Sequence, residues 1–162
     1  MMKITLRIAL ASLCLSALAV QAQAPLSPLP PLKAMTLAGA RFDPLQLKGK
    51  VAVVFYWSTA CSVCRDSLPE LRDNQTGWRN KPFALVTVNV DSSSDDWQTY
   101  ERILASTRQP SPGSISVRQD SGQSAPSKLP LTLLVNAQGK VVARYEGRLA
   151  PEVWDGVADL MP

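Results

Sequence analysis

The hydrophobic residues of this chain gather into short blocks that contain few polar positions. Residues 51–57, VAVVFYW, form one block, and residues 83–90, FALVTVNV, form a second. Continuous runs of this length, rich in β-branched and aromatic residues, are typical of strands that are covered on both faces. We therefore predict two central strands of an α/β sheet.

Apolar residues at helical spacing follow each block. Between residues 61 and 79 they fall near one stripe: Cys64, Leu68, Leu71 and Trp78. Pro69 lies inside this stretch and is expected to kink the helix rather than end it. Residues 91–107 open with Asp and Ser residues that can cap a helix, and they continue with Trp97, Tyr100, Ile103 and Leu104 at helical intervals. The order strand, helix, strand, helix predicts parallel strands joined by right-handed crossovers.

The end of the chain predicts a β-hairpin and a closing helix. Residues 131–135 are mostly apolar, residues 136–139 suit a turn, and apolar residues alternate with polar ones from position 141 to 145. Residues 151–161 place four apolar side chains on one helical face: Val153, Trp154, Val157 and Leu160. We expect this helix to cap the sheet, with Trp78, Trp97 and Trp154 in the core rather than in a ligand cage.

Two segments are less regular. Residues 35–50 contain short apolar clusters broken by Gly39, Pro44 and Gly49, as expected of an edge hairpin or a loop. Residues 115–120, ISVRQD, fit either a short strand or an extended edge segment.

The first residues have the character of an export signal. Lys3 and Arg7 precede a largely apolar run over residues 8–20, and small residues near position 22 suggest cleavage after Ala22. The run is shorter than the roughly 18 residues expected of a membrane span, although an uncleaved anchor is the alternative. We divide the chain into a signal peptide (1–22), a Pro-rich linker (23–34) and one domain (35–162).

Composition narrows the classes of partner and cofactor. The 17 Lys and Arg residues exceed the 13 Asp and Glu residues by only four, and no basic cluster is interleaved with aromatic residues. We therefore expect no nucleic-acid partner. The chain has no histidine, and only two of its three cysteines lie after the predicted signal. These residues cannot supply the four ligands of a structural zinc site, so we expect no metal and no cofactor.

Cys61 and Cys64 are the residues with the most distinctive chemistry. A cross-link over four residues stabilises a fold by about 2 kcal/mol, against about 3 kcal/mol for fifteen residues, so a structural staple is a weak explanation. At a strand-to-helix turn, unpaired N–H groups and the helix dipole would stabilise a Cys61 thiolate. Cys64, one turn later, can resolve a mixed disulfide. In an oxidising compartment we therefore expect Cys61 to be the nucleophile and Cys64 the resolving thiol.

Two longer stretches carry a family resemblance: LAGARFDPLQLKGKVAVVFYWSTACSVCRDSLPEL and KLPLTLLVNAQGKVVARYEGRL. They resemble the TlpA/ResA-like branch of the thioredoxin superfamily, extracytoplasmic thiol–disulfide oxidoreductases, from about residue 39 to residue 160. The resemblance implies a thioredoxin-like α/β fold, with a central mixed β-sheet flanked by helices, an N-terminal hairpin and an inserted helix. It further implies that Pro130 is cis and faces the cysteines, that the Leu129 backbone pairs with substrate, and that Trp57 and Ala60 border the substrate site.

The chain departs from the family pattern around the cysteines. Ala60 stands where the family usually has Trp, Val63 where it has Pro, and Ser67 where it often has Glu. Phe55 replaces the buried acid that many thioredoxins carry, which removes an obvious proton acceptor for Cys64. Because the chain has no histidine either, the sequence leaves that acceptor and the redox direction open. Arg65 is interpreted as a surface residue, with thiolate stabilisation as the alternative.

These observations favour a periplasmic disulfide reductase. It would act on a disulfide-bearing substrate protein, be regenerated by a membrane electron-donor protein, and serve cytochrome c or metalloprotein maturation, as the resemblance implies. A disulfide-donating oxidase is chemically symmetrical, and a copper(I) carrier with two thiolates is a further alternative from another class. A binding module without redox activity is the remaining hypothesis. We expect the protein to be a monomer.

Overall fold

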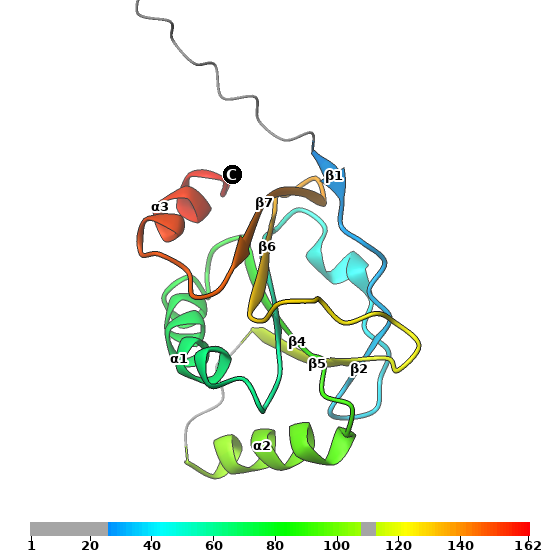
Figure 1. The fold of residues 1–162 in the computed structure, drawn as a ribbon. Helices are drawn as coiled ribbons and strands as arrows, with labels where there is room; N and C mark the ends of the chain where they lie inside the picture. Colours follow the sequence, from blue (N-terminus) through cyan, green and yellow to red (C-terminus); the bar gives the residue numbers. More distant parts are fainter. Residues whose placement is uncertain (1–25, 108–112) are drawn as a thin grey trace, which may run out of the picture.

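The computed structural model describes residues 26–107 and 113–162, and every structural statement below concerns these residues. They form one mixed sheet of seven strands in the order β1-β7-β6-β3-β4-β5-β2, with helices packed around it (Figure 1). The predicted signal peptide lies outside the described residues.

The two predicted central strands are present and parallel. β3 (Val51–Trp57) pairs with β4 (Phe83–Asn89) along its whole length, and every residue of both strands is buried. The helix between them, α1 (Ser62–Gly77), continues through Pro69. Burial on both faces explains why these blocks show no alternation of polar and apolar residues.

The remaining elements complete the sheet. α2 (Ser94–Thr107) leads from β4 to β5 (Ser114–Gln119), which is parallel to β4, so the segment with two alternative predictions is a strand. β6 (Leu131–Val135) and β7 (Lys140–Glu146) form the predicted hairpin, and β6 is antiparallel to β3. The closing helix is α3 (Glu152–Asp159).

The expected N-terminal hairpin is also present. β2 (Ala34–Thr36) turns back so that Met35 forms an antiparallel bridge with Arg41, and the Thr36 N–H donates to the Ala40 carbonyl at 2.8 Å. Gly39 takes a φ of 79° in this turn, a left-handed conformation that favours glycine. A short 3₁₀ helix, η1 (Pro44–Leu47), leads from the hairpin towards β3.

The predicted Pro-rich linker, residues 23–34, includes described residues that contact the sheet, while residues 23–25 lie outside the described part of the chain. β1 (Ser27–Pro28) pairs with Val141 and Lys140 at the edge of the sheet. Leu32 is only 6% exposed and belongs to the core. Proline disfavours a helix or a central strand but is tolerated in an edge strand, so this Pro-rich segment packs as an extended cover.

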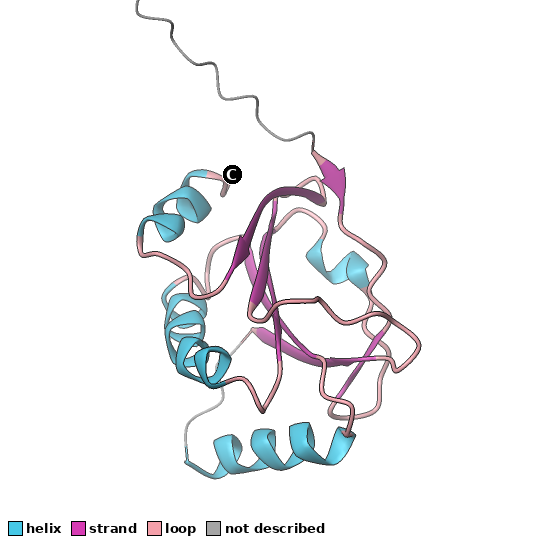
Figure 2. Ribbon diagram, in the orientation of Figure 1, coloured by secondary structure: helices cyan, strands magenta, loops and turns pink. Residues whose placement is uncertain are grey.

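The two faces of the sheet have separate cores. Alternate residues of β3, among them Phe55 and Trp57, pack against α1, α3 and Trp97 of α2. The other residues of β3, such as Tyr56, pack against the N-terminal segment. Figure 2 shows α1 and α3 on one side of the sheet and the N-terminal segment with η1 on the other. The N-terminal segment therefore takes the place of helices on the second face.

The apolar faces of the helices largely follow the predicted stripes. Cys64, Leu68 and Leu71 are buried in α1, and Trp154 and Val157 are buried in α3. Trp78 packs edge-on against Trp154, with ring centroids 5.9 Å apart, which supports the interpretation of these tryptophans as core residues. The exception is Ile103 of α2, which is 57% exposed because only the first half of that helix reaches the core.

Candidate active site

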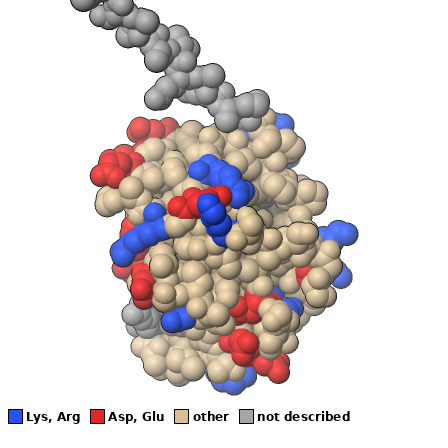
Figure 3. Space-filling view, in the orientation of Figure 1, with Lys and Arg blue, Asp and Glu red and all other residues tan. Residues whose placement is uncertain are grey.

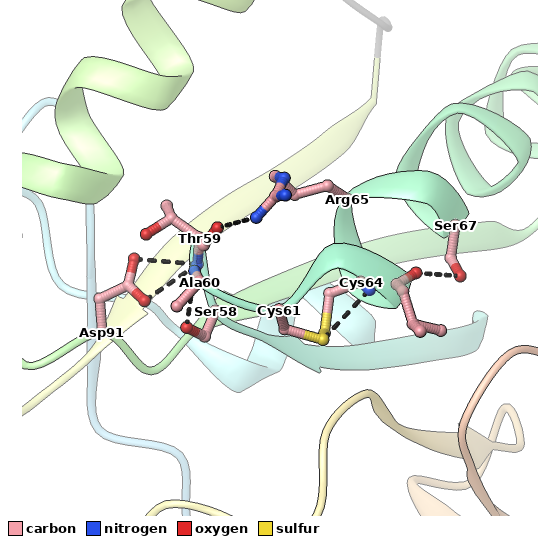
Figure 4. Close-up of a disulfide and its surroundings, with 9 residues drawn as sticks. Ser58, Thr59, Ala60, Cys61, Cys64, Arg65, Ser67 and Asp91 are labelled. Carbon is pink, nitrogen blue, oxygen red and sulfur yellow. Dashed lines mark hydrogen bonds between the residues drawn. A yellow bond between two sulfur atoms is a disulfide. The ribbon is translucent and has the colours of Figure 1, made fainter.

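Cys61 and Cys64 lie at the start of α1, immediately after the turn that follows β3. Cys61 is the N-cap residue, with extended backbone angles (φ −85°, ψ 106°), and its sulfur is bonded to that of Cys64 (Figure 4). Cys61 is half-buried, whereas Cys64 is 0% exposed and faces the core. One sulfur is therefore placed near the surface and the other is enclosed.

The first turn of α1 provides a favourable setting for negative charge on Cys61. The Cys64 backbone N–H donates to Cys61 Sγ at 3.1 Å, so the sulfur takes the role that a serine or aspartate oxygen has at other N-caps. The first turn contains no acidic residue that would oppose this effect. Helix N–H groups and the helix dipole lower the pKa of a thiol in this position.

Hydrogen bonds hold the turn that carries Cys61. The Ala60 N–H donates to Ser58 Oγ, and the Cys61 N–H donates to the Ser58 carbonyl, each at 3.1 Å. The Thr59 N–H donates to both carboxylate oxygens of Asp91, at 3.0 and 3.2 Å. In the sequence, Asp91 is one of the Asp and Ser residues that can cap the following helix. It lies two residues after the end of β4, a parallel neighbour of β3, and this position indicates that it reaches the same end of the sheet.

Arg65 has a definite contact rather than a free position on the surface. Its guanidinium donates to the Thr59 carbonyl oxygen, and the residue is half-buried (Figure 4). Arg65 thus ties the first turn of α1 to the turn before it.

The other predicted site residues differ in exposure. Ala60 is exposed and Leu129 is half-buried, while Pro130 is buried. The Leu129–Pro130 peptide bond is cis, as the resemblance implied. Pro130 directly precedes Leu131, which pairs with Tyr56, so the cis bond lies at the end of the sheet that also carries the cysteines.

Trp57 is placed beneath the site. It is 0% exposed, and its ring packs against Tyr100 of α2, with centroids 4.9 Å apart and a 58° tilt. Its indole Nε1 has no hydrogen-bond partner among the described residues. The structure therefore gives Trp57 no exposed surface for a substrate, and its ring lies in the core against Tyr100.

Phe55 occupies the position at which many thioredoxins carry a buried acid, and a carboxylate from another element, that of Glu70, lies near it. Phe55 is 1% exposed and lines a cavity of about 10 Å³ together with Ser67 and Glu70 of α1. Ser67 is buried, and its hydroxyl donates to the Val63 carbonyl at 2.8 Å. Glu70 lies six residues after Cys64. The family pattern has its acids at the positions of Phe55 and Ser67, so it did not point to Glu70.

The described ranges, 26–107 and 113–162, contain neither a metal-ligating cluster nor a membrane-spanning helix. No three or more Cys, His, Asp or Glu side chains lie close enough there to hold a metal ion. None of the helices in these ranges has the length and apolar character needed to cross a membrane.

Comparisons with known proteins agree on the type of fold. A family model described as "AhpC/TSA family" matches residues 25–153. The "Thiol-disulfide oxidoreductase ResA" of Bacillus subtilis is 28% identical over 112 residues, which cover 68% of this chain and 61% of the relative. The match thus spans less than two thirds of the relative's own length.

Solved structures extend this likeness at lower identity. The exposed lipoprotein thioredoxin Etrx1 of Streptococcus pneumoniae is 18% identical with a TM-score of 0.65, covering 79% of this chain and 98% of that one. A thiol:disulfide interchange protein from Bacteroides sp. is 23% identical with a TM-score of 0.67, covering 84% and 89%. The predicted thioredoxin-like fold is therefore confirmed.

Proposed function

Since this chain belongs to the AhpC/TSA family, we propose that it is a thiol–disulfide oxidoreductase whose Cys61–Cys64 pair alternates between dithiol and disulfide. The observation that carries the proposal is the unequal placement of two bonded sulfurs at a helix N-terminus. Cys61 is half-buried at the N-cap, and Cys64 is fully buried one turn later.

The reaction follows from this placement. In the dithiol form, the Cys61 thiolate attacks one sulfur of a substrate disulfide, forms a mixed disulfide and releases the other substrate sulfur as a thiolate. Cys64 then loses its proton and attacks Cys61 Sγ. The Cys61–Cys64 disulfide forms, the second substrate sulfur leaves as a thiolate, and two electrons have passed to the substrate.

The surroundings of Cys61 suggest where the substrate binds. Ala60 is exposed, Val63 is 46% exposed and Leu129 is half-buried, and we propose that these three residues form a small apolar surface for the substrate. We assign the backbone of Leu129, with Pro130 behind it, to the alignment of the substrate chain, and Trp57 to support from below. On the face in Figure 3, positive and negative side chains are interspersed, so no single-sign patch marks a strongly charged partner there.

The proposed net direction is reduction of the substrate disulfide, which is the direction that the family resemblance implies. Donation of a disulfide to the substrate is the alternative. The two directions differ in the reduction potential of the pair. Equilibration of the protein with glutathione or dithiothreitol buffers gives that potential. A value well below the glutathione range supports a reductase, whereas a strongly oxidising value, near the −120 mV of known disulfide donors, overturns this direction.

The proposal includes the cellular location and the partners of the protein. We infer that residues 1–22 direct export to the periplasm, as a signal peptide that is either cleaved or retained as an anchor. A membrane electron-donor protein then returns the Cys61–Cys64 pair to the dithiol form. Cytochrome c or other metalloprotein cysteines are the proposed substrate class. Cells expressing Cys64→Ser should accumulate mixed disulfides with Cys61, and mass spectrometry of the trapped proteins identifies the substrate. The Cys61→Ser variant is the matched control, since it cannot form the adduct.

A copper(I) carrier predicts a different outcome for the same two thiols. Such a carrier would bind copper(I) tightly in the reduced form and would not reduce insulin. Reduction of insulin by the wild-type protein, lost in Cys61→Ser, supports the oxidoreductase. A partner captured equally well by Cys61→Ser would instead support a binding module without redox activity.

A further inference from the structure

The backbone of Thr59, two residues before Cys61, is held by hydrogen bonds at both its N–H and its carbonyl. Its N–H donates to Asp91 Oδ1 at 3.0 Å and Oδ2 at 3.2 Å, and its carbonyl accepts from the Arg65 guanidinium. Figure 4 shows Asp91 on one side of this turn and Arg65 on the other. The turn that carries the outer cysteine is thus fixed by charged side chains from two separate segments, the loop that follows β4 and the first turn of α1.

Asp91 is itself held in place by neighbouring strands. Asn89, which is 0% exposed, donates through Nδ2 to Asp91 Oδ2 at 2.9 Å and accepts from the Asp91 N–H at 3.0 Å. Arg118 of β5 donates to the backbone carbonyls of Asp91 and Ser92, at 3.0 and 2.8 Å. The carboxylate therefore meets Thr59 as a pre-oriented acceptor rather than as a mobile surface group.

We propose that Asp91 and Arg65 are positioning residues for the thiol chemistry, because together they keep Cys61 Sγ over the first turn of α1 after the disulfide has been reduced. The inference rests on the proposed function. In the oxidised form the bond to Cys64 also restrains Cys61, and that restraint disappears on reduction. The bonds to Thr59 do not involve sulfur, so they persist in the dithiol form, in which Cys61 attacks the substrate.

A positioning role and a purely electrostatic role of Asp91 predict opposite changes in the pKa of Cys61 when Asp91 is replaced. A carboxylate near a thiol raises the thiol pKa, so a purely electrostatic role means that any neutral substitution lowers the pKa of Cys61. Loss of positioning moves Cys61 Sγ away from the helix N–H groups, which raises the pKa. The sign of the change in Asp91→Ala therefore separates the two explanations.

The first experiment compares Asp91→Ala with Asp91→Asn in the full-length protein carrying Cys14→Ser and Cys64→Ser, so that Cys61 is the one thiol left to titrate. The readouts are the thiolate absorbance as a function of pH and the rate of reaction with 5,5′-dithiobis(2-nitrobenzoate). Displacement of a reacting group by about 1 Å can cost about 100-fold, and we expect at least a ten-fold slower reaction and a raised Cys61 pKa in Asp91→Ala. Asp91→Asn keeps an acceptor for the Thr59 N–H and should react within about three-fold of the parent. Asp96→Ala, which removes an exposed carboxylate from α2, is the matched control and should change neither readout.

The second experiment tests Arg65 in the same background. Arg65→Gln can still donate to the Thr59 carbonyl without carrying charge, whereas Arg65→Ala cannot. We expect Arg65→Gln to retain most of the reaction rate and Arg65→Ala to lose it. Because both side chains restrain the backbone of the same residue, Thr59, the losses in Arg65→Ala and Asp91→Ala should be less than additive in the double variant.

Two results would overturn the inference. One is a folded Asp91→Ala variant, judged by near-ultraviolet circular dichroism, whose Cys61 pKa falls or whose rate equals that of the parent. The other, which applies even if Asp91→Ala does not fold, is equal reactivity of Arg65→Ala and the parent. Failure of the proposed function has a separate signature, since the wild-type protein itself would then reduce no protein disulfide.

Discussion

The indole Nε1 of Trp154 donates to the Glu70 carboxylate at 2.9 Å, which joins α3 to α1 across 84 positions of sequence. The second Glu70 oxygen lies 3.2 Å from an Arg148 nitrogen. Trp154 is only 9% exposed, so its N–H depends on this partner, whereas the Arg148 side chain is 61% exposed.

Substitution of Glu70 should therefore separate the two contacts. We expect Glu70→Ala to lower the free energy of unfolding by about 1–3 kcal/mol, because the indole N–H of the buried Trp154 loses its acceptor. Arg148→Ala should cost less than about 1 kcal/mol, since exposed ion pairs contribute little. Urea unfolding of both variants and of Glu70→Gln, which keeps an acceptor, tests this order. Equal losses in Glu70→Ala and Arg148→Ala would contradict it.

Gln75 offers a second stability test inside the core. It is 2% exposed, and its side-chain oxygen accepts from the Leu85 N–H of β4 at 2.8 Å. Gln75→Leu leaves that buried N–H without an acceptor, so we expect a loss of about 1–3 kcal/mol. Hydrogen exchange at the Leu85 amide should accelerate in the same variant. Thr76→Val, one position along α1 and exposed, is the control.

The Tyr56 phenol should resist ionisation. Burial raises the pKa of Tyr56 above its ordinary value of 10.0, because the charged phenolate is disfavoured away from water. A folded-state pKa above the unfolded one means that the fold loses stability as pH rises from about 10 through the raised value. In a spectrophotometric titration, the wild-type protein should show one tyrosine that ionises only well above pH 10, and Tyr56→Phe should lack this late step. If the wild-type and Tyr56→Phe titrations differ only near pH 10, the prediction fails.

Glu146 should titrate in the opposite direction. Hydrogen bonds from Lys128 and then Arg144 lower the pKa of its carboxyl below the ordinary value of 4.5. A lowered folded-state pKa contributes stability above the unfolded pKa, and this contribution is lost as pH falls through the lowered value. Carbon-detected NMR should show the Glu146 pKa rising towards 4.5 in Lys128→Ala, and also in the wild-type protein at high salt, because exposed charges are screened.

Leu32 tests whether the N-terminal segment is part of the domain. Its side chain is 6% exposed in the core under the second face of the sheet. Leu32→Ala should cost about 2 kcal/mol or more in unfolding free energy, as for other core leucines. Leu26→Ala, at a side chain that is 57% exposed, should be nearly neutral. A neutral Leu32→Ala would favour the predicted linker role of residues 23–34.

Local patterns in the sequence were sufficient for the central architecture. The apolar blocks of β3 and β4 predicted buried parallel strands, and the spacing from Cys64 to Leu71 predicted the inner face of α1. These features depend on periodicity within a few residues, which a sequence shows directly. The cis bond at Pro130 came from the family resemblance alone.

The contacts that shape the site were beyond such patterns. Asp91 is 32 positions from Thr59, and its role as acceptor depends on the register between β3 and β4. Glu70 reaches the cavity beside Phe55 only because α1 packs on that face. The Pro-rich segment at β1 lacked any strand signal, because its pairing partner at β7 is supplied by the far end of the chain.

The different exposure of the two sulfurs has a consequence for the chemical modification of the reduced protein. An alkylating reagent that is too large to enter the core reaches Cys61 but not Cys64, which is 0% exposed. In a protein that also carries Cys14→Ser, limited labelling should then add one group per chain, at Cys61, and a probe attached there would report on partner docking without disturbing the interior.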